Sequence, residues 1–307
     1  MAAKQVEMTY LVMFLGAVYQ SFWKYSTILS SNDELNKIKQ FMREMQTSMK
    51  ENDMISNIRK RHLPKTLKTT MKFVRIHVTT PVLGSIFTCF TNYYITKTIL
   101  MYSTPFLNHW LDISIQFITL TSLNIVVVAS DCVLIIIVGF LVGELKTISD
   151  LASKITEEEM ILKDIYKMHI RIHEILDVFR KVFCQLSLQM ICSNFMMLCS
   201  YFYMMRYLSI SIATVVGMLA ITFQLIIVCF IGQVLLSSTE EVADALLQTP
   251  WDELSLQEQK TFLLILQMAQ RPKGIDAGGV TVISANTLVQ VTKTSMSFVA
   301  FIYTVIN

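Results

Sequence analysis

The sequence has little charge. Only 16% of its residues are Asp, Glu, Lys or Arg, whereas an ordinary soluble domain carries about 25%. Hydrophobic residues make up 53% of the chain, and the mean hydropathy is +0.51. A water-soluble fold cannot bury that much apolar surface, so the composition predicts a polytopic membrane protein.

The sequence also lacks the motifs of several functional classes. It contains no Asn-x-Ser/Thr acceptor, no Gly-rich phosphate loop and no His/Cys cluster, so we expect no cofactor and no metal. No nucleophile–base pair is apparent, and an enzyme is therefore not expected. The six Cys fall inside apolar runs, without the loop spacing of a disulfide framework. The polar opening Met1–Glu7 and the run after it contain no cleavable signal.

Long apolar runs are what the sequence has instead. Six of them approach the ~20 residues that a helix needs to cross a bilayer, namely 7–29, 72–96, 112–144, 182–205, 207–236 and 284–306. Lys24 interrupts the first run, and the third is long enough to project beyond the bilayer. The predicted fold class is an all-α, polytopic membrane helical bundle.

The connections between these runs alternate between long and short. Residues 30–71, 145–181 and 237–283 are long, polar and patterned for helix, and strict alternation puts all three on one membrane face. From Lys24 to Arg75 the chain has twelve basic residues and five acidic ones. The positive-inside rule makes that face cytoplasmic. We therefore expect both chain ends outside.

The long connections have helix signals of their own. The pairs Ser238/Glu241 and Ser255/Glu258 each have the spacing of a capping box. Apolar residues after Ser255 fall mostly on one helical face, as do those of 145–181. Such a stripe needs a partner, because short helices rarely persist alone in water. The pattern predicts that the membrane helices extend into a packed cytoplasmic anchor domain; the alternative is a helix lying flat on the inner leaflet.

The C-terminal third contains residues with a recognisable pattern. The stretch "IVCFIGQVLLSSTEEVADALLQTPWDELSLQEQKTFLLILQMAQRPKGIDAGG", followed by "LVQVTKTSMSFVAFI", resembles the same third of insect odorant receptors. The matching features are Phe230–Gly232, Ala243–Asp244–Ala245, Trp251 with Leu254–Ser255, Arg271–Pro272, Ala277–Gly278 and Lys293–Thr294–Ser295. Upstream similarity is weaker and includes Asp131 in the long helix and the segment "KYSTILSSNDELNKIKQFMREM". The resemblance covers essentially the whole chain.

The resemblance implies both architecture and function. Members of this family have seven spans and a cytoplasmic N-terminus, so the six visible spans would be the second to the seventh, with the first missing. The members are ligand-gated, non-selective cation channels in which an odour-specific subunit assembles with a co-receptor subunit into a tetramer. The implied setting is the plasma membrane of an olfactory sensory neuron, with membrane lipid and a small apolar volatile ligand as partners and no nucleic acid.

The same resemblance divides the chain into three parts. Residues 1–236 would form the transmembrane bundle with the odorant pocket, 237–283 the cytoplasmic anchor segment, and 284–307 the pore-lining last helix. Within the anchor segment we expect Gly278 and Gly279 to loosen the chain before the last span.

Three groups of site residues follow from this division. The pore residues recur every four positions on one helix face, with the gate at the last two: Lys293, Ser297, Phe301 and Val305. The ligand-binding residues lie in the outer half of the bundle: Tyr10, Met13, Phe14, Phe87, Phe90, Thr91, Tyr94, Phe117 and Thr121. The subunit anchor consists of Trp251, Leu254, Phe262 and Leu266. Ordinary helix packing is the alternative for each group. Asp131 is expected to be a structural anchor near the inner membrane interface.

Three other functions stay open at this point. A gustatory receptor of the related family is also a channel, but would lack the 243–255 tract. A G-protein-coupled receptor needs an inside C-terminus. A solute transporter should show inverted repeats or helices broken by Gly and Pro, and with nine Gly and five Pro neither is evident.

Overall fold

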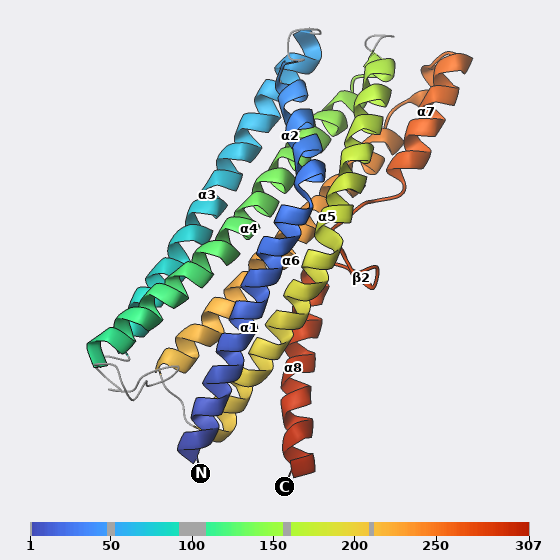
Figure 1. Cartoon of the computed structure of the whole chain (residues 1–307). Coiled ribbons are helices and arrows are strands. Elements are labelled where there is room, and N and C mark those ends of the chain that lie inside the picture. The colour runs from blue at the N-terminus through green and yellow to red at the C-terminus, as the bar shows by residue number, and fades with distance from the viewer. Residues whose placement is uncertain (1, 48–52, 92–108, 156–160, 209–211, 307) are drawn as a thin grey trace.

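The chain is almost entirely helical, as its sequence predicted (Figure 1). The computed structural model describes residues 2–47, 53–91, 109–155, 161–208 and 212–306. In chain order the elements are α1 (Ala2–Ser30), α2 (Asn32–Thr47), α3 (Asp53–Thr91), α4 (His109–Ala152), α5 (Ile161–Tyr203), the π-helical turn η3 (Met204–Leu208), α6 (Ile212–Leu247), the 3₁₀ turn η4 (Trp251–Glu253), α7 (Leu256–Ala269), β1 (Asp276–Ala277), β2 (Thr281–Val282) and α8 (Ala285–Ile306).

The central helices are much longer than a bilayer is thick. α4 has 44 residues, α5 has 43 and α6 has 36, so even α6 extends about 54 Å, against a hydrocarbon core of about 30 Å. Among the described residues, four helices are long and apolar enough to cross a membrane, namely α4, α5, α6 and α8. The expected spans 7–29 and 72–96 fall on α1 and α3, and part of the second lies outside the described residues.

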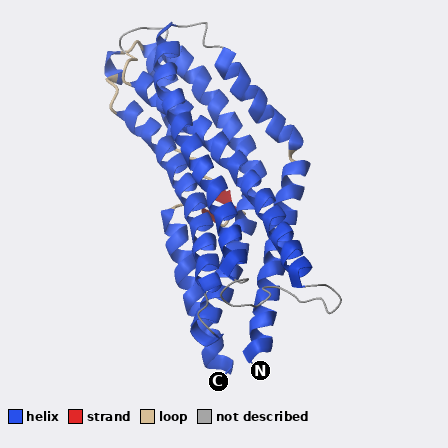
Figure 2. Cartoon of the chain, turned by 90° about the vertical axis from the view of Figure 1, so that its left-hand side faces the viewer, coloured by secondary structure: helices blue, strands red, loops and turns tan. Residues whose placement is uncertain are grey.

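The long polar connections gather at one end of the bundle. Figure 1 shows α2 and α7 at the same end as the end of α4 and the start of α5, while both chain termini lie at the opposite end. Figure 2 shows the two termini together from another side. We call the end that contains α2 and α7 the inner end; it comprises the described parts of 30–71, 145–181 and 237–283. The outer end is the opposite half of the helices.

The hydrophobic core is centred at the inner end. Leu145, Ile148 and Leu151 of α4 belong to one buried cluster with Ile165 and Phe179 of α5. α7 adds its own buried residues to this cluster, so the helices of the inner end pack as one unit. The apolar stripe predicted within 145–181 is therefore buried inside the chain.

One of the two predicted capping boxes forms. The Ser255 backbone N–H and hydroxyl both donate to Oε2 of Glu258, at 3.0 and 2.6 Å, and α7 begins at the next residue. These hydrogen bonds stabilise the charged carboxylate and hold the pKa of Glu258 below its ordinary value. The cap therefore fixes where α7 starts.

The other predicted capping box, at Ser238, was wrong. α6 continues without interruption to Leu247, and Ser238 is buried inside it. The reason lies in the packing: Leu235, Val242 and Leu246 continue the buried stripe of α6 past this position. Burial of these side chains outweighs a local start signal.

The expectation that two glycines loosen the chain before the last span was also wrong. Gly278 and Gly279, with φ of +63° and +74°, form the tight turn of the β1–β2 hairpin. Positive φ is costly for other residues, so the turn requires glycine. The Gly278 N–H donates to the Cys184 carbonyl oxygen on α5, and the Gly279 N–H donates to Asp276 Oδ1, both at 3.1 Å. The hairpin thus ties the start of α8 to α5.

α3 and α4 make the most extensive helix–helix contact in the described chain. Gly139 and Gly143 lie four residues apart on α4, facing Thr70 and Leu63 of α3. A Cβ atom on either glycine would overlap the facing side chain. Small residues at this spacing let two membrane helices approach closely.

Candidate functional site

α8 has two different faces. Its buried face packs against α5 and includes Val291, Ser295 and Val299. The four predicted pore residues share the opposite face and are all exposed: Lys293, Ser297, Phe301 and Val305. Phe301 is 62% exposed and Val305 67%, so the described chain leaves this face open to another molecule.

The predicted ligand-binding residues are described only in part. Tyr94 lies outside the described residues, as do the side chains of Tyr10, Phe87, Phe90 and Thr91. Phe14 is half-buried on α1, and Phe117 is exposed on α4. The structure therefore shows no single pocket made by the whole predicted set within the part of the chain that it describes.

Met13 belongs to a small apolar cluster at the outer end. It packs with Met197 and Met204, apart from the main core. Ala17, Tyr201 and Ile221 surround these three side chains. Another member of the predicted set, Thr121, has a buried hydroxyl with no hydrogen-bond partner among the described residues. Thr121 thus offers a polar group that a bound molecule could satisfy.

The predicted anchor residues separate into two environments. Phe262 is buried in the core of its own chain, and Leu266 packs against that core. Trp251 is exposed on η4, and Leu254 is half-buried. The same segment also exposes four large apolar residues, Leu247, Leu256, Leu263 and Leu264. Leu256 and Leu263 were expected to share one helical face with Phe262, but they lie outside the buried face that Phe262 forms.

A buried charged cluster joins four helices. Lys24 Nζ of α1 lies 2.5 Å from Oδ1 of Asp131 on α4, and the two side chains are 2% and 1% exposed. His77 Nε2 of α3 lies 3.2 Å from the other carboxylate oxygen, and the Gln224 side-chain amide of α6 lies 3.4 Å from it. A lone charge at such a depth is costly, but this carboxylate has three partners. The cluster therefore holds α1, α3, α4 and α6 together.

Sequence reasoning identified Asp131 as an anchor but missed its partners. Lys24 was interpreted as an interruption of an apolar run and as one of the basic residues of the inner face, and not as a partner of Asp131, which lies 107 positions further along the chain. Two opposite charges in two separate membrane runs were the available signal. Periodicity within each run does not reveal which helices are neighbours, so the pairing could not be assigned.

A second buried ion pair lies at the inner end. Arg59 Nε of α3 donates to Oε2 of Glu144 on α4 at 3.0 Å, and both side chains are buried. Arg59 also donates to the Met45 carbonyl oxygen at 3.3 Å, close to the end of α2. This arginine therefore joins three helices of the inner end, and sequence reasoning did not single it out.

The comparison with known families decides what kind of protein this is. The sequence profile of the family described as 7tm Odorant receptor matches residues 6–296. The chain belongs to the insect odorant receptor family. Membership makes it a multi-pass membrane protein and a receptor rather than an enzyme. It also sets aside the gustatory receptor, G-protein-coupled receptor and transporter alternatives.

Solved structures show the same fold. The insect olfactory receptor OR5 from Machilis hrabei in complex with eugenol superposes with a TM-score of 0.78 at 13% identity, covering 97% of this chain and 82% of that one. A second structure of that receptor gives a TM-score of 0.70 at 14% identity, covering 95% and 79%. No curated protein matches the sequence. At this identity the similarity establishes the odorant receptor fold alone.

Proposed function

We propose that this odorant receptor chain is the odour-tuning subunit of a ligand-gated, non-selective cation channel. It assembles with a co-receptor subunit into a heterotetramer in the plasma membrane of an olfactory sensory neuron. The observation that carries the proposal is the open face of α8, on which all four predicted pore residues lie. Lys293 and Ser297 are polar side chains on a candidate membrane span and are left bare by their own chain, and polar groups in a membrane rarely face lipid, so this face supports a neighbouring subunit or a water-filled path.

The gate follows from the side chains on that face. When one such helix from each subunit surrounds a common axis, Phe301 and Val305 form apolar rings towards the outer end. A narrow apolar ring expels water and stops ions without a physical plug. Outward movement of the rings lets hydrated cations through. Ser297 lines the path further in, and Lys293 lies where the path widens.

The ligand is a small apolar volatile molecule. Such a molecule forms few hydrogen bonds, so its affinity comes mainly from buried area and shape. The cluster of Met13, Met197 and Met204 supports an adaptable site at the outer end, since methionine side chains repack easily. The unsatisfied hydroxyl of Thr121 offers one polar contact. Eugenol, bound by the related receptor, is a molecule of this class.

The anchor segment has a face for the neighbouring subunit. Phe262 and Leu266 hold it to its own chain, which leaves Trp251, Leu256 and Leu264 exposed on the inner end. These large apolar side chains lie beyond the membrane-spanning stretch of α6, where lipid does not cover them. We assign this exposed face to subunit contacts.

The test is co-expression with a co-receptor subunit and measurement of odour-evoked cation current. We expect volatile ligands to evoke current only when both subunits are present, with the co-receptor alone as the control. Current equal to that of the co-receptor alone, with this chain at the cell surface, would contradict the proposal. A C-terminal tag should bind antibody on intact cells, and external protease should not cleave near Trp251. Cleavage there would contradict the orientation.

A further inference from the structure

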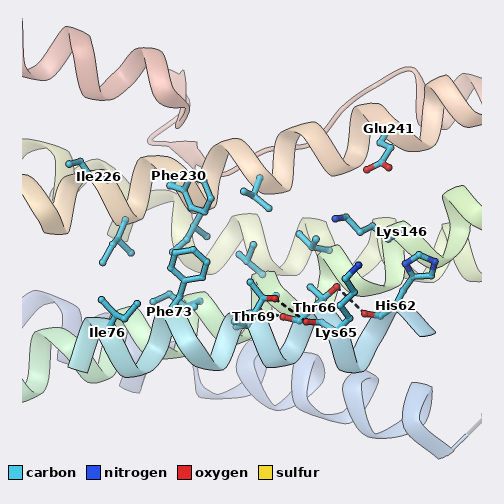
Figure 3. A pocket seen from close by; sticks show the side chains of 18 of the residues that line it. His62, Lys65, Thr66, Thr69, Phe73, Ile76, Lys146, Ile226, Phe230 and Glu241 are labelled. Carbon is cyan, nitrogen blue, oxygen red and sulfur yellow. Dashed lines mark hydrogen bonds between the residues drawn. The ribbon is translucent and has the colours of Figure 1, made fainter. Parts of the chain in front are cut away.

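A groove of about 720 Å³ runs along the surface between α3, α4 and α6, on the inner side of the charged cluster at Asp131 (Figure 3). None of the predicted ligand-binding, pore or anchor residues lines it. Its two ends differ in chemistry, and this difference indicates what fills it.

The end nearer the middle of the bundle is apolar. Phe73 and Ile76 of α3 face Ile226 and Phe230 of α6, and all four side chains are exposed. The rings of Phe73 and Phe230 lie 5.5 Å apart and span the opening between the two helices. Water in this part of the groove would hydrate large apolar surfaces, so an apolar occupant is favoured.

The other end is polar and carries two positive charges. In Figure 3 the side chains of Lys65 on α3 and Lys146 on α4 point into it. Among the described residues, neither ammonium group forms an ion pair. Asp150 also lines this end, but its carboxylate contacts His62 Nε2, at 2.8 Å, and forms no ion pair with either lysine, so both ammonium groups can reach an anionic group. Glu241 lines the same end from α6, where its carboxylate can contact a positively charged group attached to that anion.

The distance from the two lysines to the apolar end of the groove is close to the depth of one leaflet. Lys65 and Ile76 are eleven positions apart on α3, as are Ile135 and Lys146 on α4. Eleven residues of helix rise about 16 Å, and half of the hydrocarbon core is about 15 Å. The polar end is the one that leads to α2 and α7. The proposal below therefore puts the membrane boundary at the two lysines, and Asp131 deeper in the bilayer than its expected place near the inner interface.

We propose that this groove is a binding site for a phospholipid of the inner leaflet. One acyl chain lies along Phe73, Ile76, Ile226 and Phe230, and the phosphate lies between the ammonium groups of Lys65 and Lys146. Only the assignment to the inner leaflet rests on the proposed orientation of the channel. The occupant joins α3 and α6 on the side of the bundle away from α8.

The test is photolabelling of the purified full chain in phosphatidylcholine nanodiscs. The probe is a phosphatidylcholine whose acyl chain ends in a diazirine, and mass spectrometry locates the labelled residues. We expect strong labelling at Phe73 and Phe230. The exposed apolar residues Leu15 and Phe22 of α1 serve as the internal reference for bulk lipid contact.

Charge reversal tests the phosphate contact. The double variant Lys65→Glu/Lys146→Glu should lower groove labelling roughly tenfold relative to α1, because two attractive charges become repulsive. The matched control is Lys68→Glu/Lys72→Glu, two exposed lysines of the same helix that do not line the groove. The proposal would be overturned by an equal loss of groove labelling in both double variants, or by no loss in Lys65→Glu/Lys146→Glu.

Two further arms keep the result clear if the charge variant folds poorly. Thr69→Trp fills the mouth of the groove from an exposed position and keeps both lysines; it should abolish groove labelling, and persistence would count against the site. A diazirine diacylglycerol lacks the phosphate and should label the groove no more than α1. Equal labelling by the two probes would refute phosphate recognition. None of these readouts needs a current, so they fail or succeed independently of the channel proposal.

Discussion

The two ends of the bundle are built differently. At the inner end, helices from α2 to α7 share one buried core, and the Arg59–Glu144 pair lies inside it. At the outer end, the only separate buried cluster in the described chain is that of Met13, Met197 and Met204. Dense packing therefore coincides with the region assigned to subunit contacts, and sparse packing with the region assigned to ligand and gate, where helices must move.

The largest expected effect comes from breaking the inner ion pair. Arg59→Met leaves Glu144 buried without a cationic partner, and should destabilise the chain by about 3–5 kcal/mol. Thermal unfolding of the purified protein measures this loss. In the double variant Arg59→Met/Glu144→Leu no charge remains, and most of the stability should return. A double variant as unstable as the single one would show that the pair is not the cause.

The cluster around Asp131 should tolerate the loss of its cationic partner better than the Arg59–Glu144 pair does. After Lys24→Met the carboxylate keeps its contacts to His77 and Gln224, so the loss should be smaller than for Arg59→Met, about 2–3 kcal/mol. The same unfolding measurement compares the two variants directly. A larger loss of stability for Lys24→Met than for Arg59→Met would show that the additional contacts of Asp131 do not make its cluster more tolerant than the Arg59–Glu144 pair.

Helix contact at the inner side of the bundle depends on Gly139. The variant Gly139→Ala places a Cβ atom against Thr70 and should cost about 1–3 kcal/mol through overpacking. Gly84→Ala on α3 is the matched control, since nothing lies within 4 Å of a Cβ there. That control should be neutral or slightly stabilising. Equal melting temperatures for the two variants would remove the argument for close α3–α4 approach.

At the outer end, the change with the clearest readout is Phe301→Ala. A smaller side chain widens the apolar ring, so the basal current should rise roughly tenfold without ligand, which corresponds to about 1.4 kcal/mol in the closed–open balance. Met296→Ala is the control, because the Met296 side chain is similarly exposed, 56% against 62% for Phe301, but lies on another face of α8. Basal current raised by both variants, or by neither, would argue against a gate at Phe301.

The smallest effect is expected at the start of α7. Ser255→Ala removes the hydroxyl that donates to Glu258 and should cost about 1 kcal/mol. Ser238→Ala, inside α6, removes no cap and should cost less. The same unfolding measurement compares the two, and a larger loss at Ser238 would mean that the start of α7 does not depend on this hydroxyl.

Local features of the fold could be predicted from the sequence, and contacts between distant segments could not. The helices, the shared end of the long connections and the cap at Ser255 follow from periodicity and short spacing within one segment. The cap at Ser238 fails because burial of Val242 and Leu246 is decided by other helices. For the same reason the partner of Lys24 was not found.

The candidate site divides in the same way. The four-residue recurrence on α8 groups four side chains that the structure leaves exposed, because helical geometry alone fixes which residues share a face; their role in a pore stays a prediction. The groove between α3, α4 and α6 has no such signature, since Lys65 and Lys146 come together only through the packing of two helices. No motif in the sequence marks the residues of the groove, and the proposed lipid site depends on how the three helices pack.

The β1–β2 hairpin has a mechanical consequence. Gly278 is bonded to the backbone of α5, and Arg180 of α5 lies 3.3 Å from Asp276 in the first strand. The base of α8 is thereby held to α5, and further out the helix still contacts α5 through Ser295 and Phe298, while its other face is left uncovered by the described chain. Phe301 lies 18 positions beyond Ile283, about 27 Å along the helix. A tilt of about 5° at this base would displace the Phe301 side chain by about 2 Å. Under the proposed arrangement, in which Phe301 forms the gate, a small rotation at the base would therefore change the width of the apolar ring.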